Sequence, residues 1–119
     1  MNVVDYLAHA RALGDDYQLA INAFVDEFRR VSMGAKRDLV APPIVQGEWL
    51  EALMAAVVSY LCHEADVPQP AWVEHVKSPS PHFVLPARTF AMRVRLLLES
   101  PPPFRNRGVF VPENYLSRA

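Results

Sequence analysis

Apolar residues recur at helical spacing over much of the chain, which predicts a protein built from helices. The clearest case covers residues 15 to 33, where the apolar positions step by four, three, four and three. They share one helix face and are Tyr17, Ile21, Phe24, Phe28 and Val31. Asp15 and Gln18 together predict a capped start for this amphipathic helix.

Two further helices are predicted in the first half of the chain. One covers residues 3 to 13, with Asn2 as its cap and Gly14 as its end. The other begins near Gly47 and is apolar nearly all round, so we expect it in the middle of a bundle. Its large apolar residues are Trp49, Leu50, Leu53, Met54, Val57, Val58 and Leu61. Its uncharged run, residues 52 to 63, is shorter than the about 20 residues that cross a bilayer, so we expect no membrane span.

Prolines divide the rest of the chain into connectors and short helices. After Gly34, the segment "AKRDLVAPPI" is predicted to be a stiff extended connection, because Pro42 and Pro43 disfavour helical geometry in the residues before them. Pro70 is suited to a first helical turn, which predicts a short helix that carries Trp72.

Pro79 and Pro81 predict a loop or polyproline-like connector that crosses the fold. Phe83 and Leu85 in this segment are candidates to cover part of the core. A helix is then predicted from residue 86 to about residue 100. Its apolar positions at helical spacing are Phe90, Val94, Leu97 and Leu98.

The segment "PPPFRNRGVF", residues 101 to 110, combines features of a rigid closing element. Its three prolines predict an extended rod, after which Phe104 docks into the bundle. We expect an exposed turn at Arg105, Asn106 and Arg107. Gly108 then supplies a positive φ, "VFV" follows as a short extended segment, and "ENYL" forms a last helical turn. The segment is either a clasp that seals the bundle or a platform that presents arginines to an acidic partner.

These patterns together predict an all-α protein: a single compact bundle of four to five helices with a Pro-rich connector and an extended C-terminal clasp. Only four glycines occur and strand-like alternation is scarce, which argues against a sheet protein. A length of 119 residues and a hydrophobic content of 51% suit one folded domain over residues 1 to 119.

Charge is distributed unevenly, although the net charge is only −1. Residues 1 to 66 carry 5 Lys and Arg against 10 Asp and Glu, whereas residues 67 to 119 carry 7 against 3. Such asymmetry either steers a partner or lets one half pack on the other. The single cysteine, Cys62, cannot form an internal disulfide, and no signal peptide is recognisable, so a cytoplasmic location is expected.

Candidate catalytic and metal-binding patterns fail on spacing. In "CHEAD" the neighbouring Cys62 and His63 point about 100° apart on a helix, so they cannot share one ion. Cys62 is expected to fill the core, and His63 with Glu64 to form a solvated helix end. No serine lies in a nucleophile elbow, and no phosphate-binding or dinucleotide glycine motif occurs. We therefore predict no catalytic residue, no metal and no cofactor, and the protein is not expected to be an enzyme.

A family resemblance is carried by "GEWLEALMAAVVSYLCHEADVP", by "PAWV" at 70 to 73 and by residues 87 to 119. They resemble an uncharacterised helical domain of bacterial, largely actinobacterial, proteins that commonly lies C-terminal to an Xre-type helix-turn-helix. The likeness is best over residues 45 to 119, and "PPFRNRG" is its strongest motif. Proteins of this kind resemble antitoxin or regulator components encoded beside nucleotidyltransferase-like toxins. Since the chain begins almost directly at the helical domain, we expect it to hold a protein partner or to dimerise rather than to read operators.

The leading hypothesis is a non-catalytic protein-interaction module, an antitoxin-like or regulatory component of a two-protein bacterial system. Trp and Arg are the side chains that most often anchor interfaces. The candidate partner-binding residues are therefore Trp72, Arg88, Arg95, Arg105 and Arg107. One alternative is nucleic-acid binding by the same arginines, although the sequence pI near 6.4 argues against it. The other is a structural domain that binds a small ligand.

Overall fold

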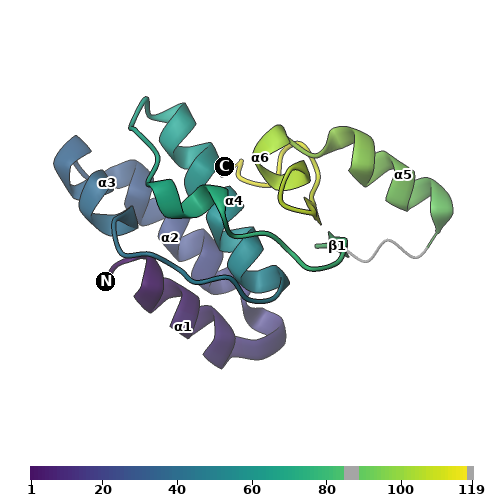
Figure 1. Ribbon diagram of the computed structural model, residues 1–119, viewed down its shortest axis with the longest axis horizontal. Helices are drawn as coiled ribbons and strands as arrows, with labels where there is room; N and C mark the ends of the chain where they lie inside the picture. The colour runs from purple at the N-terminus through teal and green to yellow at the C-terminus, as the bar shows by residue number, and fades with distance from the viewer. Residues whose placement is uncertain (85–88, 118–119) are drawn as a thin grey trace.

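The computed structural model describes residues 1 to 84 and 89 to 117, and the described part is a helical bundle, as the sequence predicts (Figure 1). Its α-helices are α1 (Val3–Leu13), α2 (Gln18–Arg30), α3 (Met33–Val40), α4 (Trp49–Glu64), α5 (Phe90–Glu99) and α6 (Pro102–Arg105). Two 3-10 turns are η1 (Gly14–Asp16) and η2 (Ala71–Glu74). The short strands β1 (His82–Phe83) and β2 (Val109–Phe110) pair in parallel.

Local sequence signals determine where α1 begins and ends. The Asn2 side chain accepts a hydrogen bond from the Asp5 N–H at 3.1 Å, and the Asp5 carboxylate accepts one from the Asn2 N–H at 2.9 Å. This reciprocal capping box satisfies two donors that the first turn of a helix leaves without partners. Gly14 ends the helix with a φ of +59°, a left-handed value that glycine adopts without strain. The predicted bounds of this helix are confirmed.

The predicted capped start of the second helix at Asp15 is wrong. Residues Gly14–Asp16 form the turn η1, and α2 begins at Gln18 directly after Tyr17, whose side chain makes no capping hydrogen bond. The helix also ends earlier than predicted, at Arg30, because the chain becomes extended at Val31. Because the chain enters the helix through a 3-10 turn, backbone groups at the helix start find hydrogen-bond partners without a side-chain cap.

The extended connection predicted after Gly34 is also wrong in its first part, where α3 forms. Ser32 caps this helix by accepting a hydrogen bond from the Ala35 N–H at 3.4 Å. Most residues between this cap and Val40 are good helix formers, and the restriction imposed by Pro42 acts only on the residue before it. The proline pair therefore ends a helix here and does not prevent one.

The central position of α4 is confirmed. Twelve of its residues are buried, including Leu53, Met54 and Val57, which are fully enclosed. The helices α1, α2 and α6, the turn η2 and the strand β2 all pack against it. A helix with no polar face is stable in this position because every side meets another element.

The C-terminal segment closes the bundle. Phe104 is fully buried, with its ring centroid 6.2 Å from that of Tyr60 and 5.7 Å from that of Tyr115, and Gly108 has a φ of +74°. The predicted burial of Phe104 and the predicted positive φ of Gly108 are confirmed. The predicted proline rod is wrong, because Pro102–Arg105 forms the short helix α6. Proline is tolerated in a first helical turn, where its missing N–H has no helical acceptor.

The two-residue strands join segments that the sequence reading placed in separate connectors. His82 pairs with Val109 and Phe83 with Phe110, whose rings stack at 5.2 Å. The His82 ring stacks on Trp49 with 4.0 Å between centroids and 7° between planes, which ties β1 to the start of α4. Leu85, predicted to cover the core, lies outside the described residues.

The described part of the molecule measures 43 × 28 × 28 Å, and α5 occupies one end of the long axis in Figure 1. The N-terminus and α3 lie toward the opposite end. Within the described ranges, no helix combines the length and apolar character needed to cross a membrane.

Candidate protein-interaction surface

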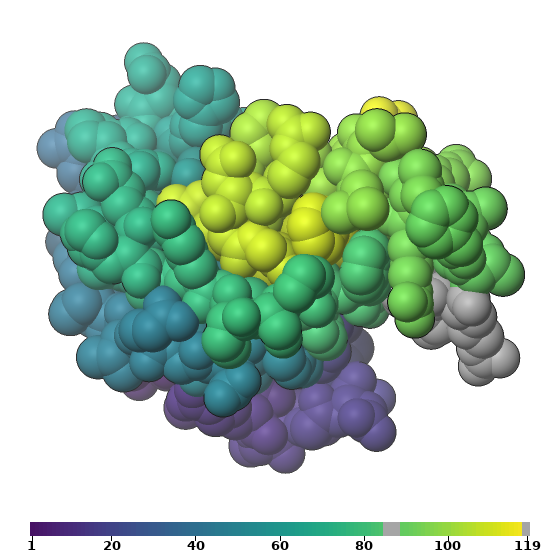
Figure 2. Space-filling view, turned by 45° about the vertical axis from the view of Figure 1, so that its right-hand side comes forward, coloured from purple at the N-terminus to yellow at the C-terminus, as the bar shows by residue number. Residues whose placement is uncertain are grey.

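Helix α5 is the least embedded of the longer helices. Its first turn is capped by Thr89, whose Oγ1 accepts a hydrogen bond from the Met92 N–H at 3.1 Å. Its far end is held by Ser100, whose buried hydroxyl lies 2.6 Å from the Leu96 carbonyl oxygen and accepts from the Val111 N–H at 2.8 Å. Among the described elements, none packs extensively against α5. The helix is therefore anchored at its C-terminal end and projects from there, as Figure 2 shows in green beside the yellow C-terminal segment.

Most large apolar side chains of α5 face solvent. Phe90 is 83% exposed, Leu98 76%, Met92 46% and Leu97 40%, whereas Leu96 is the buried residue of this helix. An amphipathic helix on a protein surface normally turns its apolar stripe toward the core. The stripe predicted from the spacing exists, but it points outward. We refer to Phe90, Val94, Leu97 and Leu98 as the α5 apolar face.

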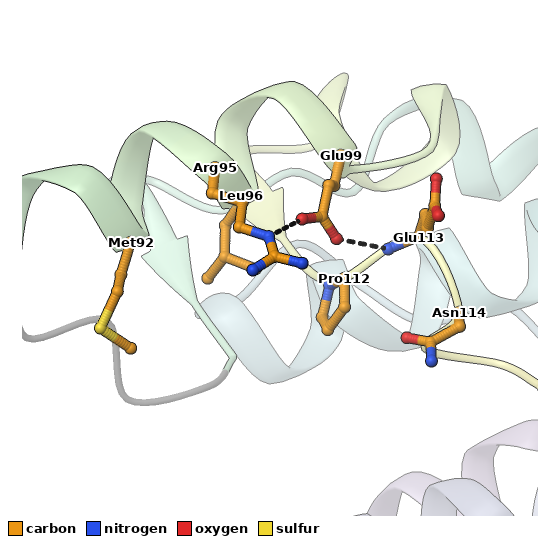
Figure 3. A pocket seen from close by; sticks show the side chains of 7 residues that line it. All are labelled: Met92, Arg95, Leu96, Glu99, Pro112, Glu113 and Asn114. Carbon is orange, nitrogen blue, oxygen red and sulfur yellow. Dashed lines mark hydrogen bonds and ion pairs between the residues drawn. The ribbon is translucent and has the colours of Figure 1, made fainter.

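A groove lies between α5 and the C-terminal segment (Figure 3). It has a volume of about 460 Å³ and is lined by Met92, Arg95, Leu96, Glu99, Pro112, Glu113 and Asn114. Arg95 donates to Glu99, and the Glu99 carboxylate also accepts the Glu113 N–H at 3.4 Å. The hydrogen bond from Arg95 is the main reason why the pKa of Glu99 lies below its ordinary value. The charged side of α5 thus faces the groove, and its apolar face points away.

The described arginines that were predicted to bind a partner differ in their surroundings. The Arg95 side chain is 80% exposed, and Arg105 is exposed on α6. Arg93 is also exposed, and its guanidinium lies 5.9 Å from the centroid of the Phe83 ring. Arg88 lies outside the described residues.

Arg107 points into the molecule, so the predicted exposed turn is wrong at this residue. Only 8% of Arg107 is exposed, and its guanidinium donates to the carbonyl oxygens of Val73 at 3.0 Å and Pro103 at 2.8 Å. Burial lowers the pKa of this guanidinium, while the nearby Glu74 acts in the opposite direction. A planar group with several donors suits carbonyls that come from two separate elements. Arg107 therefore links η2 to α6.

Trp72, another predicted contact residue, is half-buried. Its indole Nε1–H donates to the Val40 carbonyl oxygen at 2.9 Å, which joins η2 to the end of α3. The geometry thus gives Trp72 an internal role, and the partner-binding role predicted for it stays a prediction. A buried indole usually requires such an acceptor.

A second groove lies near the opposite end of the molecule, where α1, α2 and α3 meet. It has a volume of about 360 Å³, and we call it the acidic groove. It is lined by Met1, Asn2, Asp5, Glu27, Val31, Ala35, Asp38 and Leu39. Three of these residues carry carboxylates, and none is a lysine or arginine. Glu27 accepts a hydrogen bond from the Tyr6 hydroxyl, whereas Asp38 is exposed. The acidic excess of the first half of the sequence is therefore partly gathered around one hollow.

In the "CHEAD" segment, the predicted core position of Cys62 and the predicted solvated helix end at His63 and Glu64 are confirmed. Cys62 is buried, and desolvation raises the pKa of its thiol from the ordinary value of 9.0 to about 11. His63 and Glu64 are exposed, and Glu64 accepts two hydrogen bonds from Arg29, at 2.9 and 3.0 Å. Over residues 1 to 84 and 89 to 117, no group of three or more potential ligands is placed to hold a metal ion.

The sequence had identified the residues of the α5 stripe but not their exposure. A helical period shows which residues share a face, and only the packing of the other elements decides where that face points. Comparison of the chain with protein-family models, with curated proteins and with solved structures finds no match. The likeness of residues 45 to 119 to the Xre-associated helical domain therefore stays a prediction, and the outward α5 apolar face is the strongest candidate for a functional surface.

Proposed function

We propose that this chain is a non-catalytic protein-interaction module that contacts its partner through the α5 apolar face. The observation that carries the proposal is the exposure of Phe90, Leu97 and Leu98 on one projecting helix. Single exposed apolar residues are common on proteins, but a contiguous apolar patch is typical of a surface that another molecule covers. Amphipathic helices are also a recurrent recognition element, and their partners contact apolar side chains that recur at this spacing.

A protein partner fits this surface better than a nucleic acid does. Phosphate binding relies on several exposed cations along one surface. Here Arg107 is engaged inside the fold and Arg95 is paired with Glu99, whereas Phe90 and Leu98 on the same helix as Arg95 are 83% and 76% exposed. Apolar helix faces are instead matched by apolar grooves or helices of proteins.

The resemblance supports a narrower version of the proposal, in which the module is the antitoxin-like or regulatory component of a two-protein bacterial system in the cytoplasm. The partner would then be a nucleotidyltransferase-like toxin. The motif "PPFRNRG" follows α5 in the chain, and two of its residues pack in the bundle, since Phe104 is buried beside α4 and Arg107 links η2 to α6. The motif thus contributes to the fold and does not form the exposed face of α5.

The test is recovery of the tagged chain from the cells that encode it, followed by mass spectrometry of the eluate. We expect a stoichiometric protein partner with the wild type and its loss with the double variant Phe90→Gln/Leu98→Gln. Glutamine is a good helix former, so both substitutions keep α5 helical while removing its apolar surface. Leu19→Gln, at a residue that is 63% exposed on α2, is the matched control and should retain the partner. Equal recovery from all three chains would rule out the α5 apolar face.

A second candidate, binding of a small ligand, is supported by the groove beneath α5. Its volume of about 460 Å³ lies in the range of ligand pockets, and it combines apolar side chains with the Arg95–Glu99 ion pair. A screen of amphiphilic fragments, followed through the methyl resonance of Met92, tests it. Specific shifts at Met92 that saturate with concentration are expected. Unchanged resonances throughout the screen would leave the interaction module as the surviving proposal.

A further inference from the structure

We infer that Arg93 is a positioning residue for the α5 apolar face and that it acts through the ring of Phe83. The inference rests on the proposed function, because it names what fixes the direction of the same surface. The Arg93 guanidinium lies over the Phe83 ring, 5.9 Å from its centroid. Arg93 belongs to α5 and Phe83 to β1, so this contact joins the projecting helix to the rest of the bundle.

The residues that hold α5 lie on one side of the helix. Leu96 is the buried residue of α5, and Ser100, directly after its last turn, accepts a hydrogen bond from the Val111 N–H at 2.8 Å. Arg93 comes three residues before Leu96 and seven before Ser100, and these spacings place all three on the same side. Of the three, Arg93 lies nearest to the first turn of α5, so it holds the part of the helix that carries Phe90.

Phe83 gives this contact a firm support. Its ring stacks on that of Phe110 with 5.2 Å between centroids and 29° between planes, and the two residues pair in the register of β1 and β2. Phe110 is only 8% exposed, and β2 packs against α4. Val111, to which Ser100 is bonded, follows Phe110 directly and is fully buried. Arg93 and Ser100 therefore attach α5 to the same part of the bundle.

The place of Arg93 around the helix axis explains how it sets the direction of the apolar face. Successive residues of a helix are about 100° apart, so Leu97 lies about 40° and Phe90 about 60° from Arg93, both on the side away from Leu96. A roll of α5 about its axis by this amount would bring Phe90 to the side that Arg93 now holds. Burial of apolar surface favours such a roll. The guanidinium over the Phe83 ring opposes it and keeps Phe90 and Leu97 in solvent.

An arginine suits this role for chemical reasons. Its guanidinium is planar, always charged and able to stack on an aromatic face. Arg93 is exposed, so the contact does not require its charge to leave water. A cation–π contact at an exposed site corresponds to roughly a two- to fivefold change in an equilibrium constant. This is enough to bias the direction of a helix against which no described element packs extensively.

The first experiment is NMR spectroscopy of the purified full chain, at a concentration at which it is monomeric. The wild type should show a ring-current shift at the Arg93 side chain and residual dipolar couplings that give α5 one orientation relative to α4. Phe83→Leu should abolish the ring-current shift. Both Phe83→Leu and Arg93→Gln should reduce the couplings of α5 and leave those of α4 unchanged. Arg95→Gln, on the same helix but paired with Glu99, is the matched control and should keep the couplings of α5.

Two conservative variants separate positioning from a general loss of structure. Phe83→Tyr keeps the aromatic face and should keep the couplings of α5. Arg93→Lys keeps the cation but lacks the planar group, so it should restore only part of what Arg93→Gln loses. Unfolding of Arg93→Gln in urea should stay close to that of the wild type, because the contact orients α5 and adds little to the bundle.

The second experiment uses the partner recovered through the α5 apolar face. Arg93→Gln and Phe83→Leu should each raise its dissociation constant by roughly two- to fivefold. The double variant should raise it no further than the stronger single variant, because both substitutions remove the same contact.

Two results would overturn the inference. The first is unchanged couplings of α5 in both Arg93→Gln and Phe83→Leu, which would leave the proposed function unaffected. The second is weaker partner binding in Arg93→Gln but not in Phe83→Leu, because Arg93 would then contact the partner directly. If the couplings change as expected and no partner is recovered, Arg93 does position α5 and the proposed function is wrong.

Discussion

Two phenylalanines show how strongly position decides the role of a residue. Phe104 is fully buried against the rings of Tyr60 and Tyr115, whereas Phe90 is 83% exposed at the start of α5. The first contributes to stability through burial and close packing. The second contributes little to the isolated fold, so its apolar surface is available for contact with another molecule.

Substitution of the two residues should therefore have opposite consequences. Phe104→Ala is expected to lower the free energy of unfolding by about 3–5 kcal/mol, because it removes a buried ring and leaves a cavity. Phe90→Ala should change it by no more than about 0.5 kcal/mol. Urea denaturation, at a protein concentration low enough to keep the chain monomeric, measures both. Similar losses in the two variants would mean that Phe90 is packed within its own chain.

The arginine pair of the C-terminal turn provides a second comparison. Arg107→Ala should destabilise the fold by about 2–3 kcal/mol, since the carbonyls of Val73 and Pro103 would lose their donors. Arg107→Lys should recover only part of this loss, because an ammonium group lacks the planar fork. Arg105→Ala, at an exposed position, is the control and should cost no more than about 0.5 kcal/mol. Equal stability of Arg107→Ala and Arg105→Ala in denaturant titrations would contradict the internal role of Arg107.

Cys62 predicts a feature of the alkaline stability profile. Its pKa is about 11 in the folded chain and near the ordinary 9.0 in the unfolded chain. The folded state therefore holds an extra proton between these values, and stability should fall as the pH rises from about 9 to about 11, by roughly 2 kcal/mol. Cys62→Ala, compared with the wild type by denaturation across this range, should show a smaller fall. Tyr6, Tyr17 and Tyr115 contribute to the part that remains, because burial also raises their pKa values. Parallel profiles for both proteins would show that the thiol does not contribute.

At the level of elements, α4 and α5 differ in what holds them in place. Twelve residues of α4 are buried, compared with Leu96 alone in α5. Helical stability in proteins comes mainly from such packing, since short helices are marginal by themselves. Stability is thus expected to be unequal along the chain, with the weakly packed helix α5 carrying the proposed interaction surface.

Hydrogen exchange should reveal this difference. The Phe90→Gln/Leu98→Gln variant is used because no partner is expected to cover its α5. In this variant the amides of α5 are expected to exchange well before those of α4, because local opening of α5 disrupts few contacts. Mass-spectrometric detection of peptides from the two helices measures it, with α1, whose capping box and buried face stabilise it, as an internal reference. Equal protection of α4 and α5 would contradict the weak attachment of α5.

Elements with strong local signals could be predicted from the sequence, and those set by distant partners could not. The capping box of Asn2 and the all-round apolar pattern of α4 act within a few residues, so both predictions held. The pairing of His82 with Val109 joins residues far apart in the chain, and two-residue strands leave no alternation to detect. The helix α3 was not predicted for another reason: Pro42 and Pro43 disfavour helical geometry, but they follow Val40, and the Ser32 cap starts the helix well before them.

At the scale of the whole molecule, the sequence predicted unlike charge in the two halves but not its arrangement. The acidic groove depends on Asp5, Glu27 and Asp38 meeting from three helices, and spacing along the chain does not show this. Arg107 was misplaced for the same reason, because its acceptor at Val73 lies 34 residues away. The direction of the α5 apolar face likewise follows from the packing of the rest of the chain.

The parallel pair of β1 and β2 has a consequence for how this protein can change. The pair brackets a stretch in which α5 projects, whereas Ser100, Phe104 and Arg107 are buried. Closure entropy grows only slowly with loop length, so the projecting part that carries α5 can be shortened, lengthened or replaced at small cost to the bundle. The residues that determine binding specificity are thereby separate from those that stabilise the fold. In protein design, α5 can be exchanged for another segment while the rest of the bundle is kept, and natural sequence variation has the same freedom.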